Sequence, residues 1–369
     1  MEYVFLFLSM LAGAATNALG LVRRGPAGGV VIFKLDHIGD LVTAGPAIAA
    51  IRAERPGEEV TLVVGSWCAE LAHALAGVDR VVTYDSPAFA RDTAGRSRRL
   101  GEALGARRFV AAYGLRDDAA SMLYCLAGGA LRRRDRGTVR VAHRIRRSLA
   151  RLFGRGDPGP LHEVETNLRV AGRRSGADLP VPRLRVPEEA SSSVEETVEA
   201  LRGPGKRRLV VVHPGAAWEF RRWSAPRFAE LVARLVQEGG VSIAVTGSSD
   251  ERGVAESVAV PGPHCRVLAG DLSLLETAAL VSAADCYVGA DTGIMHMAVA
   301  VSTPVVALFG PQDPRRFGPV GPRDVVIRHP VACAPCRQRT CPRDGECMRK
   351  IGVDEVADAV NRVLSGEAG

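Results

Sequence analysis

The chain has 369 residues, more than one hydrophobic core usually organises, so two domains are expected. With 47% hydrophobic and 24% charged residues, 40 Gly and 22 Pro, the composition excludes a disordered or fibrous chain and is typical of a globular α/β protein. The net charge is +7, but residues 131–155 hold ten Arg and one Asp, a local +9 that leaves −2 for the rest. The basic character is therefore confined to one segment.

A long apolar run opens the sequence. Residues 3–22 carry no charged side chain and are followed by Arg23 and Arg24, and their length is about that needed to cross a bilayer core. The acidic Glu2 and the length of the run do not fit a cleavable signal peptide. Residues 1–28 are therefore predicted to associate with a membrane, either by spanning it with a cytoplasmic body or as a helix lying at the interface or on the protein.

Strand-like runs then alternate with helical patterns. Strands are expected at 30–35, 60–65, 80–85 and 109–115, with helices in between. Residues 172–206, with four prolines and a serine triplet, read as an interdomain connection that holds one helix near 191–202. The alternation restarts with strands at 208–215, 241–247, 266–270, 286–291 and 304–310, and helices at 226–237, 250–258, 274–284 and from about 292.

This order predicts the fold class and the domains. Strands and helices in βαβα order with short connections indicate parallel sheets covered by helices on both faces. Two such sheets in tandem place a ligand cleft between their strand ends. The predicted domains are residues 29–185 and 186–352, followed by a C-terminal helix at 353–369.

Several common phosphate and metal motifs are absent from the sequence. It contains no G-x-G-x-x-G after a strand, no G-x-x-x-x-G-K-[ST], no H-E-x-x-H and no D-x-D. Any phosphate site is therefore expected to work without a metal or in an unconventional way.

Two strand-to-helix turns stand out as candidate sites. In the first, Gly39 and Asp40 follow the first strand, and the Asp40 carboxylate could act as a general base. Alternatively, Asp40 is simply an N-cap or first-turn aspartate, which helix polarity favours. In the second, Asp291, Thr292 and Gly293 open a helix whose free N–H groups can receive an anion.

Further residues are candidates for this second site. His296 lies about one turn along the helix that follows Asp291, and it could face the ligand or hydrogen-bond within the core. The loop from His213 to Trp223 follows another strand, and Arg221 or Arg222 on it could neutralise a phosphate.

Four of the eight cysteines are clustered. Cys333, Cys336, Cys341 and Cys347 form C-x2-C-x4-C-x5-C, a spacing open to a structural metal such as zinc, to two disulfides or to free thiols in a loop. A cytoplasmic location argues against the disulfides. The other four cysteines are expected to be small buried hydrophobes.

The arginine-rich run at 131–155 has two main interpretations. It could grip anionic head groups or a phosphorylated glycolipid acceptor, or it could be a solvated basic face. Nucleic-acid binding is not expected, because only Phe153 interleaves an aromatic ring and no RNA- or DNA-binding motif is present.

Taken together, the motifs resemble glycosyltransferase family 9, the lipopolysaccharide heptosyltransferase family. The resemblance runs from about Val30 to Leu364. It rests on K-x3-IGD-x5-P, HPGA followed by R-x-W, DTG-x2-H, ALFGP-x-DP, the late cysteines and HEVETNL at 162–168. Arg221 stands where the family commonly has lysine, and Gly114 stands where many members have an acidic residue.

The resemblance implies a GT-B fold of two Rossmann-like domains whose parallel sheets face a central cleft. It implies an inverting, metal-independent glycosyltransferase with Asp40 as catalytic base, an acceptor domain at 29–185 and a nucleotide-sugar domain at 186–352. The implied donor-binding residues are Gly39, His213, Arg221, Asp291, Thr292, Gly293 and His296. Arg116 and Arg144 are candidate acceptor-binding residues.

The expected reaction moves a sugar, heptose from ADP-heptose in the best-known members, onto a lipopolysaccharide-core or related glycan. No catalytic cofactor is expected, and the expected location is the cytoplasmic face of the inner membrane. Two alternatives remain open at this point: a GT-B epimerase or hydrolase of nucleotide sugars, and a non-catalytic sugar-nucleotide-binding protein.

Overall fold

The computed structural model describes residues 28–85, 104, 107, 109–115, 132–135, 139, 142–143, 145–149, 158–176, 178–336, 338 and 340–367. The chain divides into two compact units, Met1–Pro182 and Arg183–Gly369. The division falls inside the segment that the prolines marked as a connection. Each unit is built on its own parallel sheet, as expected for the α/β class.

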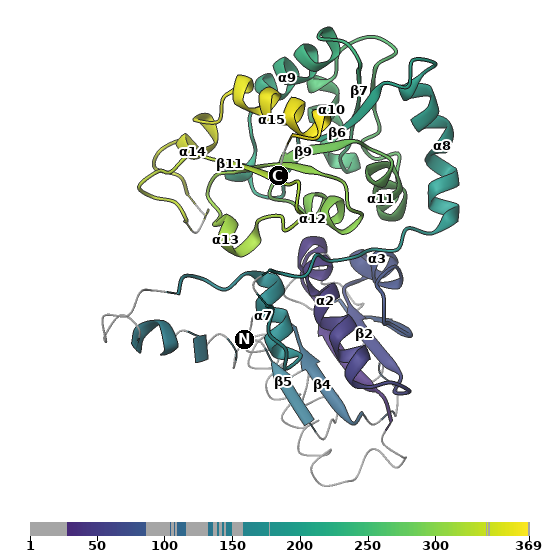
Figure 1. Ribbon diagram of the computed structural model, residues 1–369, viewed down its shortest axis with the longest axis vertical. Helices are drawn as coiled ribbons and strands as arrows, with labels where there is room; N and C mark the ends of the chain where they lie inside the picture. The colour runs from purple at the N-terminus through teal and green to yellow at the C-terminus, as the bar shows by residue number, and fades with distance from the viewer. Residues whose placement is uncertain are drawn as a thin grey trace. The chain divides into compact units, whose positions relative to one another are not determined.

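The N-terminal unit contains a five-stranded sheet in the order β3-β2-β1-β4-β5, of which β2, β4 and β5 are labelled in Figure 1. All four strand pairs are parallel. The strands are β1 (Val30–Lys34), β2 (Val60–Val64), β3 (Arg80–Thr83), β4 (Ala111–Gly114) and β5 (Arg132–Asp135). Every residue of β1 and β2 is buried, which explains why these strands are apolar apart from Lys34 and Thr61.

The strand β5 differs from the sequence expectation. Residues 132–135 belong to the arginine-rich run, which was interpreted as a basic surface, yet they pair in parallel with β4, with Ala111 opposite Arg132. Strand pairing uses backbone groups, so an edge position can accept a charged sequence that hydrophobic periodicity does not reveal.

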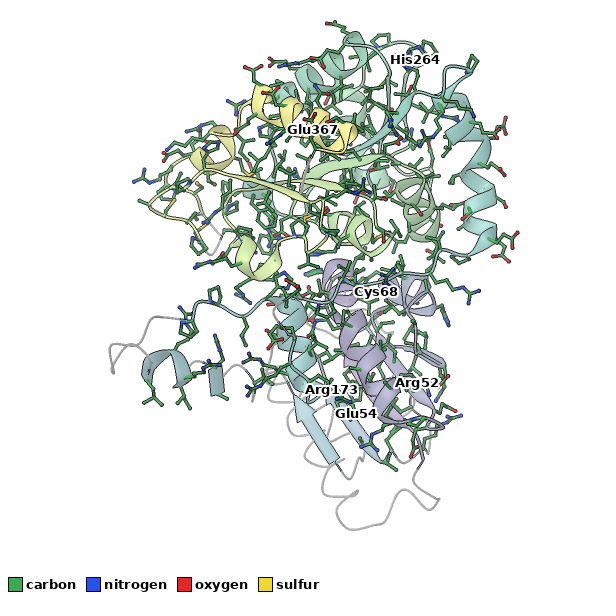
Figure 2. All side chains as sticks on the ribbon, in the orientation of Figure 1. Arg52, Glu54, Cys68, Arg173, His264 and Glu367 are labelled. Carbon is green, nitrogen blue, oxygen red and sulfur yellow. The ribbon has the colours of Figure 1, made fainter. Side chains whose placement is uncertain are left out.

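Two helices of this unit pack together. They are α2 (Ile38–Glu54) and α7 (Glu163–Val170), and α3 (Ala69–His73) lies against β2 and β3. The buried Asn167 donates its side-chain amide to the carbonyl oxygen of Thr43 at 3.3 Å, which joins α7 to the first turns of α2. Glu54, the last residue of α2, and Arg173, three residues beyond α7, are labelled in Figure 2 and form an ion pair of 3.1 Å.

The C-terminal unit contains a six-stranded parallel sheet in the order β11-β10-β9-β6-β7-β8. Its strands are β6 (Arg208–His213), β7 (Val241–Val245), β8 (Cys265–Val267), β9 (Cys286–Ala290), β10 (Val305–Phe309) and β11 (Val325–Arg328). Counted from β6, this is the doubly wound order 3-2-1-4-5-6 of Rossmann folds.

Helices cover both faces of this sheet (Figure 1). One face carries α9 (Ala225–Gln237), α10 (Arg252–Val258) and α15 (Val353–Ser365). The other carries α8 (Glu188–Arg202), α11 (Leu274–Ser282) and α12 (Gly293–Ala300). The short elements are η1 (Ser66–Cys68), η2 (Glu219–Arg221), η3 (Ser249–Glu251), α13 (Pro314–Phe317) and α14 (Glu346–Arg349).

Trp223 anchors the loop that follows β6. Its indole is buried, packs edge-on against Phe228 at 4.8 Å between ring centroids, and donates from Nε1 to the carbonyl oxygen of Ile351 at 3.0 Å. The loop from His213 to Trp223 is therefore fixed at one end by β6 and at the other by the segment before α15.

The predicted membrane-associating segment, residues 1–28, lies outside the described residues except for Gly28. Across the ranges that the structure does describe, no helix combines the length and apolar character needed to cross a bilayer.

Candidate functional site

The candidate residues of each unit lie at the point where its strand order reverses. In the first sheet β1 lies between β2 and β4, and in the second β6 lies between β7 and β9. Ligands of open parallel sheets bind beyond the carboxyl ends of the strands at this reversal. Asp40 follows β1, whereas His213 ends β6 and Asp291 follows β9.

In the N-terminal unit, a buried lysine lies at this point. Lys34 is the last residue of β1 and only 1% exposed. Its Nζ lies 2.5 Å from Asp36 Oδ2 and donates to the carbonyl oxygen of Leu115, just after β4, at 2.8 Å. It also lies 3.9 Å from Asp40 Oδ1. The cation therefore links the ends of β1 and β4 and lies beside two carboxylates.

Asp40 occupies the first turn of α2, one of the two arrangements expected for it. The N-cap of the helix is His37, so Asp40 is not the capping residue. Its side chain is 30% exposed, and the preceding Gly39 is buried. A partly exposed carboxylate held near a lysine can stay ionised and accept a proton, as a general base must.

The aromatic side chain of Trp67 and the thiol of Cys68 also lie near Asp36. Trp67 donates from Nε1 to the carbonyl oxygen of Asp36 at 3.0 Å, and Cys68 Sγ lies 3.9 Å from the same oxygen. Burial, together with the charges of Asp40 and Asp36, raises the pKa of Cys68 to about 12. The thiol, labelled in Figure 2, is therefore protonated and is the small buried hydrophobe that the sequence predicted.

In the C-terminal unit, Asp291 is the centre of a buried polar cluster. It is 7% exposed and accepts from Arg221 Nη1 at 3.1 Å through Oδ2. His296 Nε2 lies 3.8 Å from its Oδ1. The predicted residues Arg221, Asp291 and His296 are therefore brought together, and the Asp291 carboxylate lies between a guanidinium and an imidazole.

The helix that follows Asp291 begins as predicted. Thr292 is its N-cap, and its Oγ1 accepts from the Met295 N–H at 3.4 Å. The hydroxyl of Tyr287 lies 3.4 Å from the same oxygen, and burial raises the pKa of this tyrosine. The amide groups of the first turn, beginning with Gly293, have no intrahelical partners and are the groups that an anion would meet.

The two candidate arginines have different hydrogen-bond partners. Arg222 donates from Nε to the carbonyl oxygen of Ala216 at 2.9 Å and so supports its own loop. Arg221 donates from Nε to Gln338 Oε1 at 2.7 Å and from Nη1 to Asp291.

His213 is a buried neutral group of this unit. Its Nδ1 lies 3.3 Å from Thr246 Oγ1, and burial lowers its pKa below the ordinary value, against the opposing charge of Glu251. The Glu251 carboxylate lies against Gly215, because a Cβ added there would come within 2.1 Å of Glu251 Oε1. His213 is therefore a positioned neutral imidazole at pH 7.

Some site residues were not singled out from the sequence. Lys34 belongs to the K-x3-IGD pattern but had no assigned role, and Asp36, Glu251 and Gln338 carried no signal. A lysine is normally exposed, and only the tertiary fold shows that Lys34 is buried beside carboxylates. Gln338 meets Arg221 across 117 positions of sequence, so no local pattern could identify it.

The clustered cysteines are free thiols in the structure. Cys336 donates its N–H to the carbonyl oxygen of Pro311 at 3.0 Å, and the Gly345 N–H donates to Cys341 Sγ at 3.1 Å. Burial raises the pKa of Cys347, as do Cys341 and Cys333 nearby. Within the described ranges no three His, Cys, Asp or Glu side chains group so as to hold a metal ion, and structural zinc stays a prediction.

The candidate acceptor residues Arg116 and Arg144 lie outside the described residues. Part of the arginine-rich run is described as helix at 142–143 and 145–149. Within it the side chains of Ile145 and Leu149 are 55% and 48% exposed, one helical turn apart.

Comparison with known proteins identifies relatives of this chain. The sequence model of glycosyltransferase family 9 (heptosyltransferase) matches residues 97–346. Lipopolysaccharide heptosyltransferase 2 of Escherichia coli strain K12 is 26% identical over 310 residues, which cover 81% of this chain and 87% of that protein.

Solved structures share the fold. A glycosyltransferase of family 9 from Veillonella parvula superposes with a TM-score of 0.75 at 17% identity, covering 93% of this chain and 99% of the other. The structure of the Escherichia coli heptosyltransferase WaaC with ADP superposes with a TM-score of 0.65 at 21% identity, and the match covers 90% of this chain and 99% of the other. The expected GT-B fold, with two Rossmann-like units built on parallel sheets, is confirmed.

Proposed function

Because this chain belongs to glycosyltransferase family 9 and is therefore a glycosyltransferase, we propose that it moves heptose from ADP-heptose onto a lipopolysaccharide-core acceptor. The donor proposal is supported by the ADP complex of WaaC and the acceptor proposal by the likeness to lipopolysaccharide heptosyltransferase 2. In this proposal the unit from Arg183 onward binds the donor, and the unit before it binds the acceptor.

The observation that carries the proposal is the Arg221–Asp291 pair beside the first turn of α12. Arg221 brings a guanidinium to the carboxyl end of β9, where the N–H groups that begin α12 also lie. A guanidinium and a helix N-terminus are protein groups that readily bind a phosphate. Together they would hold the donor diphosphate and take up its charge as ADP leaves, without a metal ion.

Asp40 would supply the base. Its carboxylate would remove the proton from an acceptor hydroxyl as that oxygen bonds to the anomeric carbon of the donor. The bond from this carbon to the phosphate oxygen would break on the opposite face, so ADP leaves and the configuration inverts. Lys34, 3.9 Å from Asp40, favours the ionised carboxylate that this step needs.

His213 and His296 have supporting roles in this proposal. His213 is held neutral by burial, so it would offer the donor an uncharged hydrogen-bonding ring instead of a second cation. His296 lies 3.8 Å from Asp291 and would help to fix that carboxylate under the diphosphate. Gly39, in the first turn of α2, would leave room for the sugar beside Asp40.

The acceptor is proposed to be an anionic glycolipid at the cytoplasmic face of the inner membrane. The helix at 145–149 supports this idea, because the exposed Ile145 and Leu149 flank Arg146 and Arg147. Apolar side chains among arginines suit a surface of anionic head groups.

The donor is tested by thermal shift with ADP-heptose, ADP, GDP-mannose, UDP-glucose and dTDP-glucose. A ligand that binds the native state raises the unfolding temperature, so ADP and ADP-heptose should do so and the other three should not. A shift with one of the other nucleotide sugars alone would contradict the donor proposal.

Transfer is tested with lipopolysaccharide from a heptose-deficient strain as acceptor, followed by mass spectrometry of the lipid. The expected product is heavier by one heptose, has the inverted anomeric configuration by NMR, and still forms in the presence of EDTA. Release of free heptose at the same rate without acceptor would instead indicate a hydrolase.

A further inference from the structure

We propose that Gln338 is a positioning residue for the donor diphosphate, which it serves by fixing the orientation of Arg221. Gln338 belongs to residues 333–347, the segment that holds the four clustered cysteines and is called the cysteine loop below. The inference rests on the proposed function, because it takes Arg221 as the group that meets the diphosphate.

The first observation is how the guanidinium of Arg221 is held. Its Nε donates to Gln338 Oε1 at 2.7 Å, and its Nη1 donates to Asp291 Oδ2 at 3.1 Å and to the Asp291 carbonyl oxygen at 3.4 Å. The group is planar, so two fixed donors on different nitrogens determine its plane and its rotation. Within the described part of the chain no atom accepts from Nη2, which leaves its two N–H groups for an anion.

The second observation is that Gln338 is itself held in place. Gln338 is 8% exposed, and its backbone has φ 59°, a left-handed conformation that glutamine seldom adopts. Before it, the Cys336 N–H donates to the carbonyl oxygen of Pro311 at 3.0 Å. The cysteine loop is thus fastened close to Gln338, next to the end of β10.

The later part of the cysteine loop is also anchored near β10. A Cβ added at Gly310, the residue after β10, would lie 2.4 Å from Met348 Sδ and 3.0 Å from Cys347 Sγ. Gly310 therefore allows Cys347 and Met348 to pack directly on the strand end. The buried side chains of Cys347 and Met348 therefore hold the end of the cysteine loop against the strand end after β10.

The charge of the partner matters as well as its position. Arg221 already faces the Asp291 carboxylate, so the pair is formally neutral. An amide oxygen holds Nε without adding charge, whereas a second carboxylate there would make the cluster negative and repel a diphosphate. A neutral acceptor therefore suits the position, and we expect Gln338→Glu to weaken ADP binding although it retains an acceptor.

The experiment is a double-mutant cycle on the dissociation constant of ADP, measured by titration calorimetry on the full chain. The variants are Gln338→Met, which keeps the side-chain length and removes the acceptor, Arg221→Met, and the double variant. Gln338→Ala is a second variant at the loop position. Gln237→Met, the same change at an exposed position at the end of α9, is the matched control.

With Arg221 present, Gln338→Met, Gln338→Ala and Gln338→Glu should each raise the dissociation constant about fivefold to tenfold. With Arg221→Met, a further change of Gln338 to Met should alter it less than about twofold, because the group that Gln338 orients is gone. Gln237→Met should bind as the unchanged protein does. A purely structural role would lower the unfolding temperature without this dependence on Arg221.

The other outcomes overturn the inference in different ways. If the unchanged protein binds ADP and Arg221→Met weakens binding but Gln338→Met does not, the inference alone fails. An equal effect of Gln338→Met with and without Arg221 also refutes it. If the unchanged protein does not bind ADP, the proposed function fails and takes the inference with it.

Discussion

The two units share one strand order around their first strand, but they place different chemistry at its carboxyl end. In the N-terminal unit a buried cation, Lys34, lies between Asp36 and the partly exposed Asp40. In the C-terminal unit a buried anion, Asp291, lies between Arg221 and His296. The first arrangement leaves a carboxylate able to accept a proton, and the second leaves guanidinium N–H groups able to bind a phosphate. In the proposed function the two clusters have complementary tasks, with Asp40 as the base in one unit and Arg221 as part of the diphosphate site in the other.

Removing the base should give the largest effect. Asp40→Asn keeps the shape of the side chain and loses its proton affinity, so we expect kcat to fall about 10²- to 10⁴-fold while the dissociation constant of ADP stays unchanged. Single-turnover transfer and calorimetry measure the two quantities. Asp85→Asn, in the loop after β3, is a control expected to leave both unaltered. Near-normal transfer by Asp40→Asn would show that Asp40 is not the base, and the proposed difference in task between the two units would be lost.

Removing the buried cation should destabilise the N-terminal unit. Lys34→Met leaves Asp36 without its 2.5 Å partner, and we expect a loss of about 2–3 kcal/mol in the free energy of unfolding. Denaturant titration of the variant measures this loss, and Lys206→Met, at an exposed loop position before β6, provides the comparison. A Lys34→Met protein as stable as the unchanged one would show that the ion pair is not a structural element of this unit.

Removing the guanidinium should act on the C-terminal unit. We expect Arg221→Met to raise the dissociation constant of ADP about tenfold to fiftyfold, because a charge-assisted contact to phosphate is lost. Arg222→Met, one residue along the same loop and bonded to its own backbone, should change it less than about threefold. Equal effects of the two variants would contradict the selection of Arg221.

The smallest expected effect is a pH dependence of stability. Burial lowers the pKa of His213 in the folded protein, whereas the unfolded chain takes up the proton below about pH 6.5. Stability should therefore fall as the pH decreases below 6.5, by at most about 1.4 kcal/mol per pH unit for one proton. His213→Gln should reduce this slope in unfolding titrations between pH 7.5 and 5.5. An unchanged slope would show that other groups cause the acid sensitivity.

The sequence was most informative where burial and secondary structure produce a local pattern. Runs such as 30–35 and 304–310 are apolar because both faces of their strands are covered, so β1 and β10 were predictable. The turn at Asp291 was predictable because its motif and its helix start coincide.

Other features depend on contacts that no local pattern contains. The strand β5 has a charged sequence and is held by pairing with β4, and Arg221 differs from Arg222 because its partners Gln338 and Asp291 are distant in the sequence. Gln338 reaches its partner only through the fold of the cysteine loop. These features become visible only when distant segments are brought together.

The hydrogen bond from Trp223 to Ile351 has a practical consequence for how this protein can be shortened. The loop from His213 to Trp223 is anchored on the backbone just before α15, and Arg227 Nη1 donates to the same Ile351 oxygen at 2.6 Å. A truncation before Gly352 would remove the helix that covers Trp223's side of the sheet and loosen the support of Arg221 from behind. The last helix therefore supports the loop that carries Arg221, and an affinity tag should follow Ser365 and leave the residues before it in place.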